Sequence, residues 1–267
     1  MDGTIIAWTS ATFNPWMGCA KVSPGCAHCY AETLTKNRMG LSLWGKNGRR
    51  QITSDLNWKK PVKWNREAQE AGERRRVFCA SLCDVFEDHP TANKARPDLW
   101  ELIAATPNLD WQLLTKRPEN IANFLPVNWG GGWNNVWLGV STEDQQRAEE
   151  RLPYFDKLSA AVFFASYEPA LGPIDFFKIV RGKKLIDRLD WCIYGGESGP
   201  GFRPHDIAWP RTARDQFDKV GKAFFYKQSP AYRTEMGIEL DGEIYRKYPT
   251  PRVTKAVKPT AAETLFG

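Results

Sequence analysis

The sequence predicts an α/β fold, a partial TIM-type (β/α)6-7 barrel of mostly parallel strands. Three observations predict it: short apolar runs recur along the chain, segments with helical patterning separate them, and a polar residue follows nearly every run. Unbroken apolar runs are typical of strands buried on both faces, and their alternation with helices is typical of βαβ units. A doubly wound open sheet is the alternative. The polar residues favour a barrel, because barrels place their sites at the carboxyl ends of the strands.

Seven runs have the length and composition of strands. They are rich in Val, Ile and aromatic residues and nearly free of charge. The runs are 4–9, 76–81, 111–115, 136–141, 161–166, 191–196 and 223–228. The polar residues that follow them are Ser81, Lys116, Ser141, Glu168 and Glu197. We expect these side chains to converge at the carboxyl-terminal rim; helix caps and turns are the alternative for each one taken alone.

Four segments between the runs have helical patterning: 96–106, 117–125, 142–158 and 209–221. Pro153 must interrupt the third, because proline removes a helical hydrogen bond. The last has Pro near its start and Gly at its end, as helices do. We expect one barrel domain over residues 1–229, with a basic, Trp-bearing insertion at about 41–75, and a polar, Pro-punctuated extension over residues 230–267 that wraps the outside or frays.

Composition limits the class of protein. The 267 residues are 42% hydrophobic and 25% charged, with a net charge of +6. This balance mildly favours an anionic partner such as nucleic acid or a phosphorylated substrate. No apolar run reaches the length of a membrane span, and the first ten residues lack the regions of a signal peptide. We therefore expect a cytoplasmic protein, in which clustered cysteines indicate metal or redox chemistry rather than disulfides.

Three of the six cysteines lie in one short loop, at Cys19, Cys26 and Cys29, with a C-x6-C-x2-C spacing. A structural zinc site needs four ligands, and His28 would supply the fourth only with awkward local geometry. A [4Fe–4S] cluster bound through three irons is the alternative, because it leaves the fourth iron open for a cofactor or substrate. Three cysteines are the correct number for that site.

The other cysteines form no second metal-binding pair. Cys79 and Cys192 lie within strand-like runs and are expected to pack as small hydrophobic residues. Cys83 falls just beyond a run, near the rim.

Several stretches together resemble the radical S-adenosylmethionine superfamily, whose usual motif is C-x3-C-x-(aromatic)-C on the loop after the first barrel strand. They are most similar to a phage- and mobile-element-borne group of uncharacterised proteins with a C-x6-C-x2-C motif. The matching stretches are FNPWMGCAKVSPGCAHCYAE, LLTKRPENI, VWLGVSTEDQ, SYEPALGPID, YGGESGPGFRPHD and FFYKQ, and they run to about residue 228.

The resemblance implies that Cys19, Cys26 and Cys29 hold a [4Fe–4S] cluster and that His28 lies beside the adenine of S-adenosylmethionine. It implies reductive cleavage of that cofactor to methionine and a 5′-deoxyadenosyl radical, with flavodoxin or ferredoxin as an electron donor. The sequence departs from the superfamily at two places. The first cysteine gap is six residues instead of three, and CASLCDVFED stands where the superfamily has Gly-Gly-Glu.

The resemblance also suggests roles at the rim. In place of the missing Gly-Gly-Glu, Ser81 and Asp84 are expected to accept from the methionine amino group. Ser141 and Glu143 are expected to contact the ribose or the carboxylate. The candidate catalytic residues that face the substrate are Lys116, Glu168 and Glu197, with Arg203 and Lys227 beside them. A buried ionic network is the alternative for the two lysines and Glu168, and a turn cap is the alternative for Glu197.

The leading hypothesis is therefore a radical S-adenosylmethionine enzyme that acts on a nucleic acid, nucleobase, nucleotide or peptide, with nucleic-acid or nucleobase modification favoured. A non-catalytic, zinc-stabilised nucleic-acid-binding protein and an inactive barrel that keeps its cluster are the competing hypotheses. The basic segment interleaves Trp44, Trp58 and Trp64 with cations, which suits phosphate contact and base stacking. These cations are Arg49, Arg50, Lys59, Lys60, Lys63, Arg74, Arg75 and Arg76. A helical flap whose tryptophans pack against the barrel is the alternative.

Overall fold

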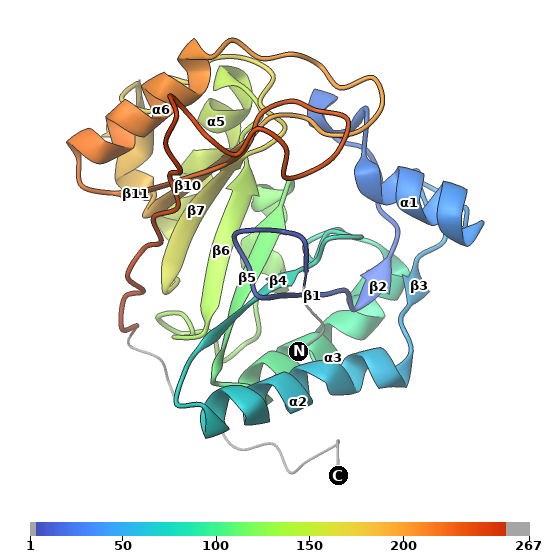
Figure 1. The fold of residues 1–267 in the computed structure, drawn as a ribbon. Helices are drawn as coiled ribbons and strands as arrows, with labels where there is room; N and C mark the ends of the chain where they lie inside the picture. Colours follow the sequence, from blue (N-terminus) through green and yellow to red (C-terminus); the bar gives the residue numbers. More distant parts are fainter. Residues whose placement is uncertain (1–3, 255–267) are drawn as a thin grey trace.

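A curled sheet of seven parallel strands forms the centre of the computed structural model, which describes residues 4–254. In spatial order its strands are β1 (Ala11–Phe13), β4 (Arg75–Cys79), β5 (Leu109–Thr115), β6 (Val136–Ser141), β7 (Val162–Tyr167), β10 (Trp191–Gly195) and β11 (Ala223–Gln228). Spatial order follows chain order, and β1 and β11 are the two edges of the curled sheet (Figure 1). The predicted partial barrel of parallel strands is confirmed.

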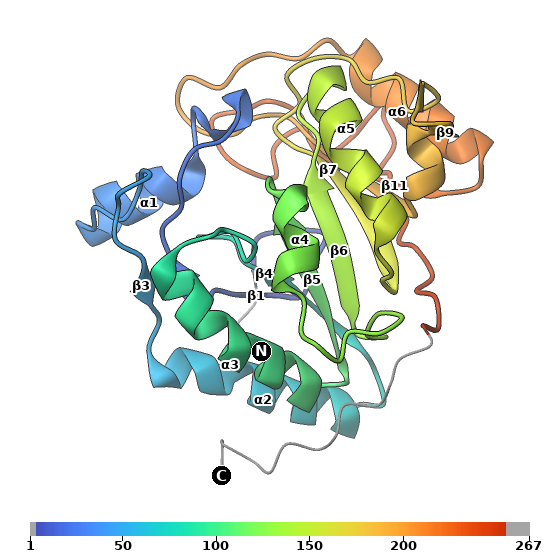
Figure 2. The ribbon, with the colours of Figure 1, turned by 180° about the vertical axis from the view of Figure 1, so that it is seen from behind.

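Helices cover the outer face of the sheet. The main ones are α2 (Asp55–Glu70), α3 (Pro90–Ala105), α4 (Ile121–Phe124), α5 (Gln145–Arg151) and α6 (Ala208–Lys219), while α1 (Tyr30–Met39) stands beside the barrel. Short 3-10 turns are η1 (Pro24–Cys26), η2 (Pro118–Asn120), η3 (Leu152–Lys157) and η4 (Leu185–Arg188). Figure 2 shows α3, α4 and α5 in front of the sheet. The proline interruption is confirmed, because α5 ends at Arg151 and a 3-10 turn contains Pro153. Within residues 4–254, no helix is both long and apolar enough to cross a membrane.

Two small antiparallel pairs lie outside the barrel. β2 (Trp16–Met17) pairs with β3 (Gln51–Ile52), and β8 (Ile179–Val180) pairs with β9 (Lys183–Lys184). The first pair joins the segment before the cysteine loop to the segment before α2, and so fixes where that loop begins.

The prediction of a first strand at residues 4–9 is wrong. The first strand is β1, which pairs with β4 through Ala11 and Val77. Residues 4–9 instead lie over the concave face of the sheet (Figure 1), where the ring of Trp8 packs 4.6 Å from that of Phe78 and 6.2 Å from that of Trp191. An apolar run can be buried either inside an open barrel or as a strand of its sheet. Its composition therefore does not decide between these two positions.

The sheet has an apolar core on each face, as strands buried on both sides require. Outside, residues such as Val77 and Leu138 pack against the helices. Inside, one row of paired residues runs from Leu114 through Gly139 and Phe164 to Trp191. A side chain at Gly139 would meet the Phe164 ring at 2.2 Å, so the glycine makes room for the inner aromatic core. The barrel interior is therefore filled, and it is open only above this row.

The segment at 41–75 contributes α2 to the helical layer. Trp58 and Trp64 are buried in the outer core, so the packing alternative is confirmed for these two tryptophans. Several cations of the segment are used in ion pairs: Arg50 with Glu87, Arg74 with Asp110 and Arg75 with Glu67. The charges of these three arginines are therefore balanced within the folded chain.

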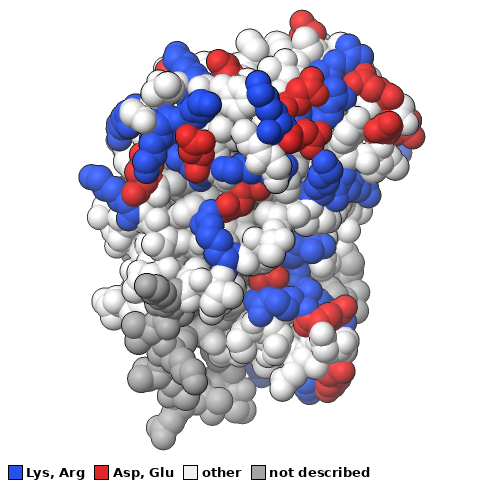
Figure 3. Space-filling view, turned by 90° about the vertical axis from the view of Figure 1, so that its left-hand side faces the viewer, with Lys and Arg blue, Asp and Glu red and all other residues white. Residues whose placement is uncertain are grey.

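The described part of the C-terminal extension packs beside β11. The backbone N–H of Tyr226 donates to the carbonyl of Tyr245 at 2.8 Å, and Tyr248 donates its hydroxyl to the carbonyl of Ala7 at 3.1 Å. The extension and residues 4–9 thus cover the gap between the two edge strands. Figure 3 shows one face of the molecule on which basic and acidic side chains are interspersed. In the extension, Asp241 pairs with Arg211 and Arg214 of α6. Residues 255–267 lie outside the described part of the chain.

Candidate functional site

A cavity of about 600 Å³ opens at the carboxyl ends of the strands. Every predicted site residue except Glu143 lines it: Cys19, Cys26, Cys29, His28, Ser81, Asp84, Lys116, Ser141, Glu168 and Glu197. Lys227 lines it too, whereas Arg203 does not. The predicted convergence at this rim is thus observed, and the role of each residue stays a prediction.

The pleat of the sheet explains why these side chains meet. Alternate residues of a strand face opposite sides, and paired residues on neighbouring strands face the same side. Ser141 pairs with Ser166 one level above the Gly139–Phe164 row, so both point inward above the filled interior. Side chains two residues further along a strand face the same side. Two residues after the inward Leu114, Ser166 and Phe225 come Lys116, Glu168 and Lys227. Inward residues at and just beyond the strand ends therefore form the floor of the cavity.

The three clustered cysteines enter the cavity from one loop. Cys26 ends η1 and Cys29 caps α1, so two short helical elements fix their positions. Cys19 follows β2. All three are free thiols. Within residues 4–254, no three His, Cys, Asp or Glu side chains are arranged to hold a metal ion.

Burial governs the protonation of these thiols. It raises the pKa of Cys19 to about 12, an effect that the nearby carboxylate of Asp84 increases and the guanidinium of Arg117 opposes. Burial also raises the pKa of Cys29. The thiolate forms that bind metals therefore need positive charge close by.

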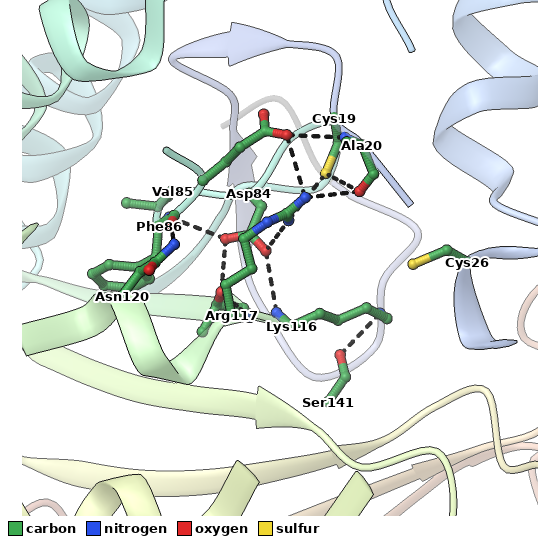
Figure 4. Close-up of polar contacts among 12 residues, drawn as sticks. Cys19, Ala20, Cys26, Asp84, Val85, Phe86, Lys116, Arg117, Asn120 and Ser141 are labelled. Carbon is green, nitrogen blue, oxygen red and sulfur yellow. Dashed lines mark hydrogen bonds and ion pairs between the residues drawn. The ribbon is translucent and has the colours of Figure 1, made fainter. Parts of the chain in front are cut away.

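Arg117 supplies positive charge next to Cys19 (Figure 4). Its Nη1 lies 3.4 Å from the Cys19 Sγ and 2.9 Å from Asp84 Oδ2, and its Nη2 donates to the carbonyl of Ala20 at 2.8 Å. Burial alone would lower the pKa of Arg117, but Asp84, Cys19 and Glu87 together outweigh it and raise that pKa above its ordinary value. The guanidinium is therefore a fixed cation beneath the start of the cysteine loop.

Glu87 extends this cluster toward the loop at 40–49. It accepts from the backbone N–H of Ala20 at 2.9 Å and pairs with Arg117 at 3.2 Å. Arg50 binds the same carboxylate at 2.7 Å and donates to the carbonyls of Leu43, Gly45 and Gly48. One buried network thus ties the cysteine loop to the loop that follows α1.

Asp84 is used within the same network. Its two carboxylate oxygens accept from Thr115 Oγ1, from Arg117 and from the backbone N–H groups of Phe86 and Lys116, at 2.7 to 3.1 Å. A carboxylate has about four acceptor positions, and all four are taken. This geometry suits positioning of Arg117 better than the predicted contact with a methionine amino group.

Glu143 lies outside the cavity wall and is fully buried, which departs from its predicted contact with the cofactor. It accepts from Ser23 Oγ at 2.7 Å and pairs with Arg151 at 3.1 Å. A side chain at Gly25 would lie 2.5 Å from the Glu143 carboxylate. Glu143 therefore anchors the middle of the cysteine loop from below.

Glu197 anchors the far side of the loop. It pairs with His28 Nδ1 at 2.9 Å and with Arg203 at 2.5 Å, and Arg203 also donates to the carbonyl of Pro24. Burial alone would raise the pKa of Glu197, but the hydrogen bonds from Arg203 and His28 hold it below its ordinary value. These contacts make Glu197 an anchor of the loop, and its predicted catalytic role stays a prediction.

Two polar groups on the floor remain directed at the cavity. Lys116 Nζ donates to Ser141 Oγ at 3.0 Å (Figure 4). It lies 4.0 Å from the nearest Glu143 oxygen. Lys227 pairs with Glu168 at 2.5 Å. A side chain at Gly195 would lie 2.8 Å from the Glu168 carboxyl carbon, so the glycine leaves space for this pair.

Sequence reasoning missed several residues of the site. Arg117 and Tyr30 stand directly beside predicted site residues, in the stretches LLTKRPENI and HCYAE, which is the signal that would have found them. Ser166 ends a predicted strand. Asn14, which hydrogen-bonds to Ser81 at 3.0 Å, lies near the start of the stretch that contains the three cysteines. Glu87 carries no such signal, because only the folded chain brings it to the loop.

Comparison with solved structures finds spore photoproduct lyase. One structure has a TM-score of 0.47 at 15% identity, covering 82% of this chain and 64% of that one. Another, with bound AdoMet and dinucleoside spore photoproduct, has a TM-score of 0.45 at 14% identity, covering 78% of this chain and 61% of that one. The chain thus spans about three fifths of the length of the latter structure.

No curated protein matches the sequence. A family model described as "Protein of unknown function (DUF5131)" matches residues 3–249, which is nearly the whole chain. The protein therefore belongs to the DUF5131 family.

Proposed function

We propose that this protein is a radical S-adenosylmethionine enzyme, with Cys19, Cys26 and Cys29 as the ligands of a [4Fe–4S] cluster and with the cofactor in the adjoining cavity. One observation carries the proposal. Three thiols of one anchored loop line the same cavity of about 600 Å³ as the polar residues at the ends of the barrel strands. Barrels of parallel strands place their active sites at this end.

The three thiols suit a cluster, in which each thiolate binds a different iron, rather than a single metal ion, for which the described residues offer no group of three ligands. Three cysteines and no fourth occupy the loop, and a cluster held by three thiolates keeps one iron open toward the cavity. Cys79 and Cys192 are fully buried in the outer core, as expected, and do not compete as ligands. Arg117 supplies the nearby cation that a buried thiolate needs. When bound, the cluster and S-adenosylmethionine supply the reductive cleavage of the cofactor.

The protein contributes position and exclusion of water. The Arg117, Glu143 and Glu197 contacts hold the cysteine loop at three places along its length. Lys116 is suited to bind an anionic group, such as a carboxylate, because its ammonium lies beside a serine hydroxyl rather than in a close ion pair. At the bottom of the cavity, Trp8 and Phe78 pack together and close the barrel interior to solvent.

The substrate that we propose is a nucleic acid or nucleobase, and reduced flavodoxin or ferredoxin is the proposed electron donor. The net charge of +6 supports the anionic substrate. The cavity also supports it, because it combines apolar and aromatic walls with a few polar groups, as sites for cofactors and bases do.

Anaerobic reconstitution with iron and sulfide tests the proposal. We expect about four irons per chain, as one [4Fe–4S] cluster requires, and an electron paramagnetic resonance signal on reduction. Cys19→Ala, Cys26→Ala and Cys29→Ala should each lose the iron. Cys79→Ala and Cys192→Ala remove the same thiol elsewhere and should keep it.

The cofactor is tested separately with iron-loaded protein. Dithionite-reduced protein should form 5′-deoxyadenosine from S-adenosylmethionine, and Lys116→Met should weaken cofactor binding in calorimetry without loss of iron. One tightly held zinc in place of iron would refute the proposal in favour of a zinc-stabilised protein. A full cluster without any binding of S-adenosylmethionine would refute the enzymatic part.

A further inference from the structure

We propose that the exposed cations of α1 and the loop after it, Lys36, Arg38, Lys46 and Arg49, bind the phosphates of single-stranded nucleic acid beside the mouth of the cavity. We name these four residues the α1 rim. The inference deepens the proposed function, since it assigns the substrate class and the surface that holds it. The proposed radical chemistry depends on the iron–sulfur cluster, whereas binding of nucleic acid to the α1 rim does not.

The α1 rim is an unusual concentration of unpaired positive charge. Residues 30–49 contain these four cations and one acidic residue, Glu32, which pairs with Lys21 at 2.9 Å. Within the part of the chain that the structure describes, none of the four cations has a hydrogen bond or an ion pair. Basic and acidic side chains are interspersed on the face shown in Figure 3. Elsewhere in the described chain, ion pairs such as Lys247 with Asp218 balance the charge. The α1 rim therefore presents a net positive surface to a polyanion.

The α1 rim is fixed to the cysteine loop. The backbone N–H of Gly45 donates to the carbonyl of Cys19 at 3.0 Å. The buried guanidinium of Arg50 binds three carbonyls of the loop after α1, those of Leu43, Gly45 and Gly48. Trp44 Nε1 donates to Thr35 Oγ1 at 2.7 Å and so joins the loop to α1. The cations therefore stand at a defined place next to the cavity rather than on a free arm.

Two aromatic residues of α1 and the loop after it, Tyr30 and Trp44, line the cavity. Tyr30 is the first residue of α1, lines the cavity and is 51% exposed. Its hydroxyl donates to the carbonyl of Ser81 at 2.8 Å, which fixes the ring at the mouth. Trp44 lines the cavity from the loop. Phosphates on the α1 rim would place a base against the Tyr30 ring, the combination of basic groove and stacking ring that single strands use.

A purely structural explanation covers only part of this charge. Lys36 and Arg38 lie in the last turn of α1, where cations stabilise the helix dipole. Lys46 and Arg49 lie in the loop, and that explanation does not apply to them. The other basic surface is weaker, because on α2 the tryptophans are buried and Lys63 and Arg66 face Glu67 and Glu70 at 3.8 Å. The observations thus favour the α1 rim.

Fluorescence anisotropy with a labelled oligothymidine of about 12 nucleotides tests the inference on the full-length protein. Binding should weaken linearly in a logarithmic plot between about 50 and 200 mM salt, and each phosphate contact adds about 0.7 to the slope. The combined variant Lys36→Ala, Arg38→Ala, Lys46→Ala and Arg49→Ala should lower the slope by about 2.8, the sum of four contacts. The matched control, Lys59→Ala, Lys60→Ala, Lys63→Ala and Arg66→Ala, removes four charges from α2 and should leave the slope unchanged.

The ring has its own test. Tyr30→Phe keeps the ring and should bind like the wild type, whereas Tyr30→Ala should bind about tenfold more weakly at every salt concentration, the loss of one stacked base. Equal binding by both variants would remove the stacking part of the inference.

Three results would overturn the inference. Loss of slope in the α2 control instead would move the surface to α2. Competition by polyglutamate as strong as by unlabelled oligothymidine would make the α1 rim a surface for an acidic protein. Absence of binding at low salt would refute any nucleic-acid surface. The iron and cofactor assays above are independent of all three, so either proposal can fail alone.

Discussion

Replacing Arg117 tests whether the buried ion pairs beneath Cys19 hold the cysteine loop. Arg117, Asp84 and Glu87 have side chains that are only 8%, 7% and 5% exposed. Removing one member of a buried pair costs about 3–5 kcal/mol, because the partner charge stays buried. In Arg117→Gln, Glu87 keeps Arg50, and Asp84 keeps three uncharged donors. We therefore expect the lower end of this range, a loss of about 3 kcal/mol in the free energy of unfolding.

Urea unfolding of the iron-free protein measures this loss. With a urea dependence of about 3 kcal/mol per molar, the upper end for domains of ordinary size, the midpoint should fall by about 1 M. Arg147→Gln is the matched control: it breaks the surface pair with Glu150, and we expect about 0.5 kcal/mol or less. Arg117→Lys should fall between the two, because it keeps the charge without the two-pronged geometry.

The same variants report on the loop. Arg117→Gln should retain less iron than the wild type after reconstitution, because the contacts to Cys19 and Ala20 are lost. The reasoning is refuted if Arg117→Gln unfolds within about 1 kcal/mol of the wild type, a loss more typical of a surface pair. It is also refuted if the variant is destabilised as expected but keeps its full iron content, since the network then supports the fold and not the loop.

Two further predictions concern the other anchors. Gly25→Ala should lose iron, because its methyl group would lie 2.5 Å from the buried Glu143 carboxylate. Ala27→Ser, on the exposed part of the loop, should keep the iron. Equal iron content in both variants would contradict the anchoring role of Glu143. Glu197 has a pKa below its ordinary value of 4.5 in the folded protein, so its contribution to stability is present above pH 4.5 and is lost as pH falls through the lower, folded value. Between pH 5 and pH 3, wild-type stability should therefore fall more steeply than that of Glu197→Gln in urea unfolding at each pH, and parallel curves would show that the carboxylate is not held by Arg203 and His28.

The sequence by itself determined the barrel and the place of the site. Six of the seven predicted strands are strands of the sheet, because unbroken apolar runs such as 136–141 and 191–196 are buried on both faces. The polar residues after these strands had to converge, since the carboxyl ends of parallel strands meet at one rim. The spacing of Cys19, Cys26 and Cys29 predicts a metal-binding loop, and this stays a prediction. These predictions rest on local patterns of sequence, which reveal the strands and their order without the identity of the contacts that each side chain makes.

Only the tertiary structure decided what each polar residue contacts. Asp84 and Glu143 each follow a strand, as a site residue would. In the folded chain, however, Asp84 binds Arg117, and Glu143 binds Ser23 and Arg151. A carboxylate binds whichever donors folding brings within about 3 Å, and these come from distant segments that local sequence does not reveal. The same holds for residues 4–9 and for Trp58, whose apolar character required burial without specifying the surface against which they pack. The apolar character of a side chain requires that it be buried, whereas the path of the whole chain determines which residues it contacts.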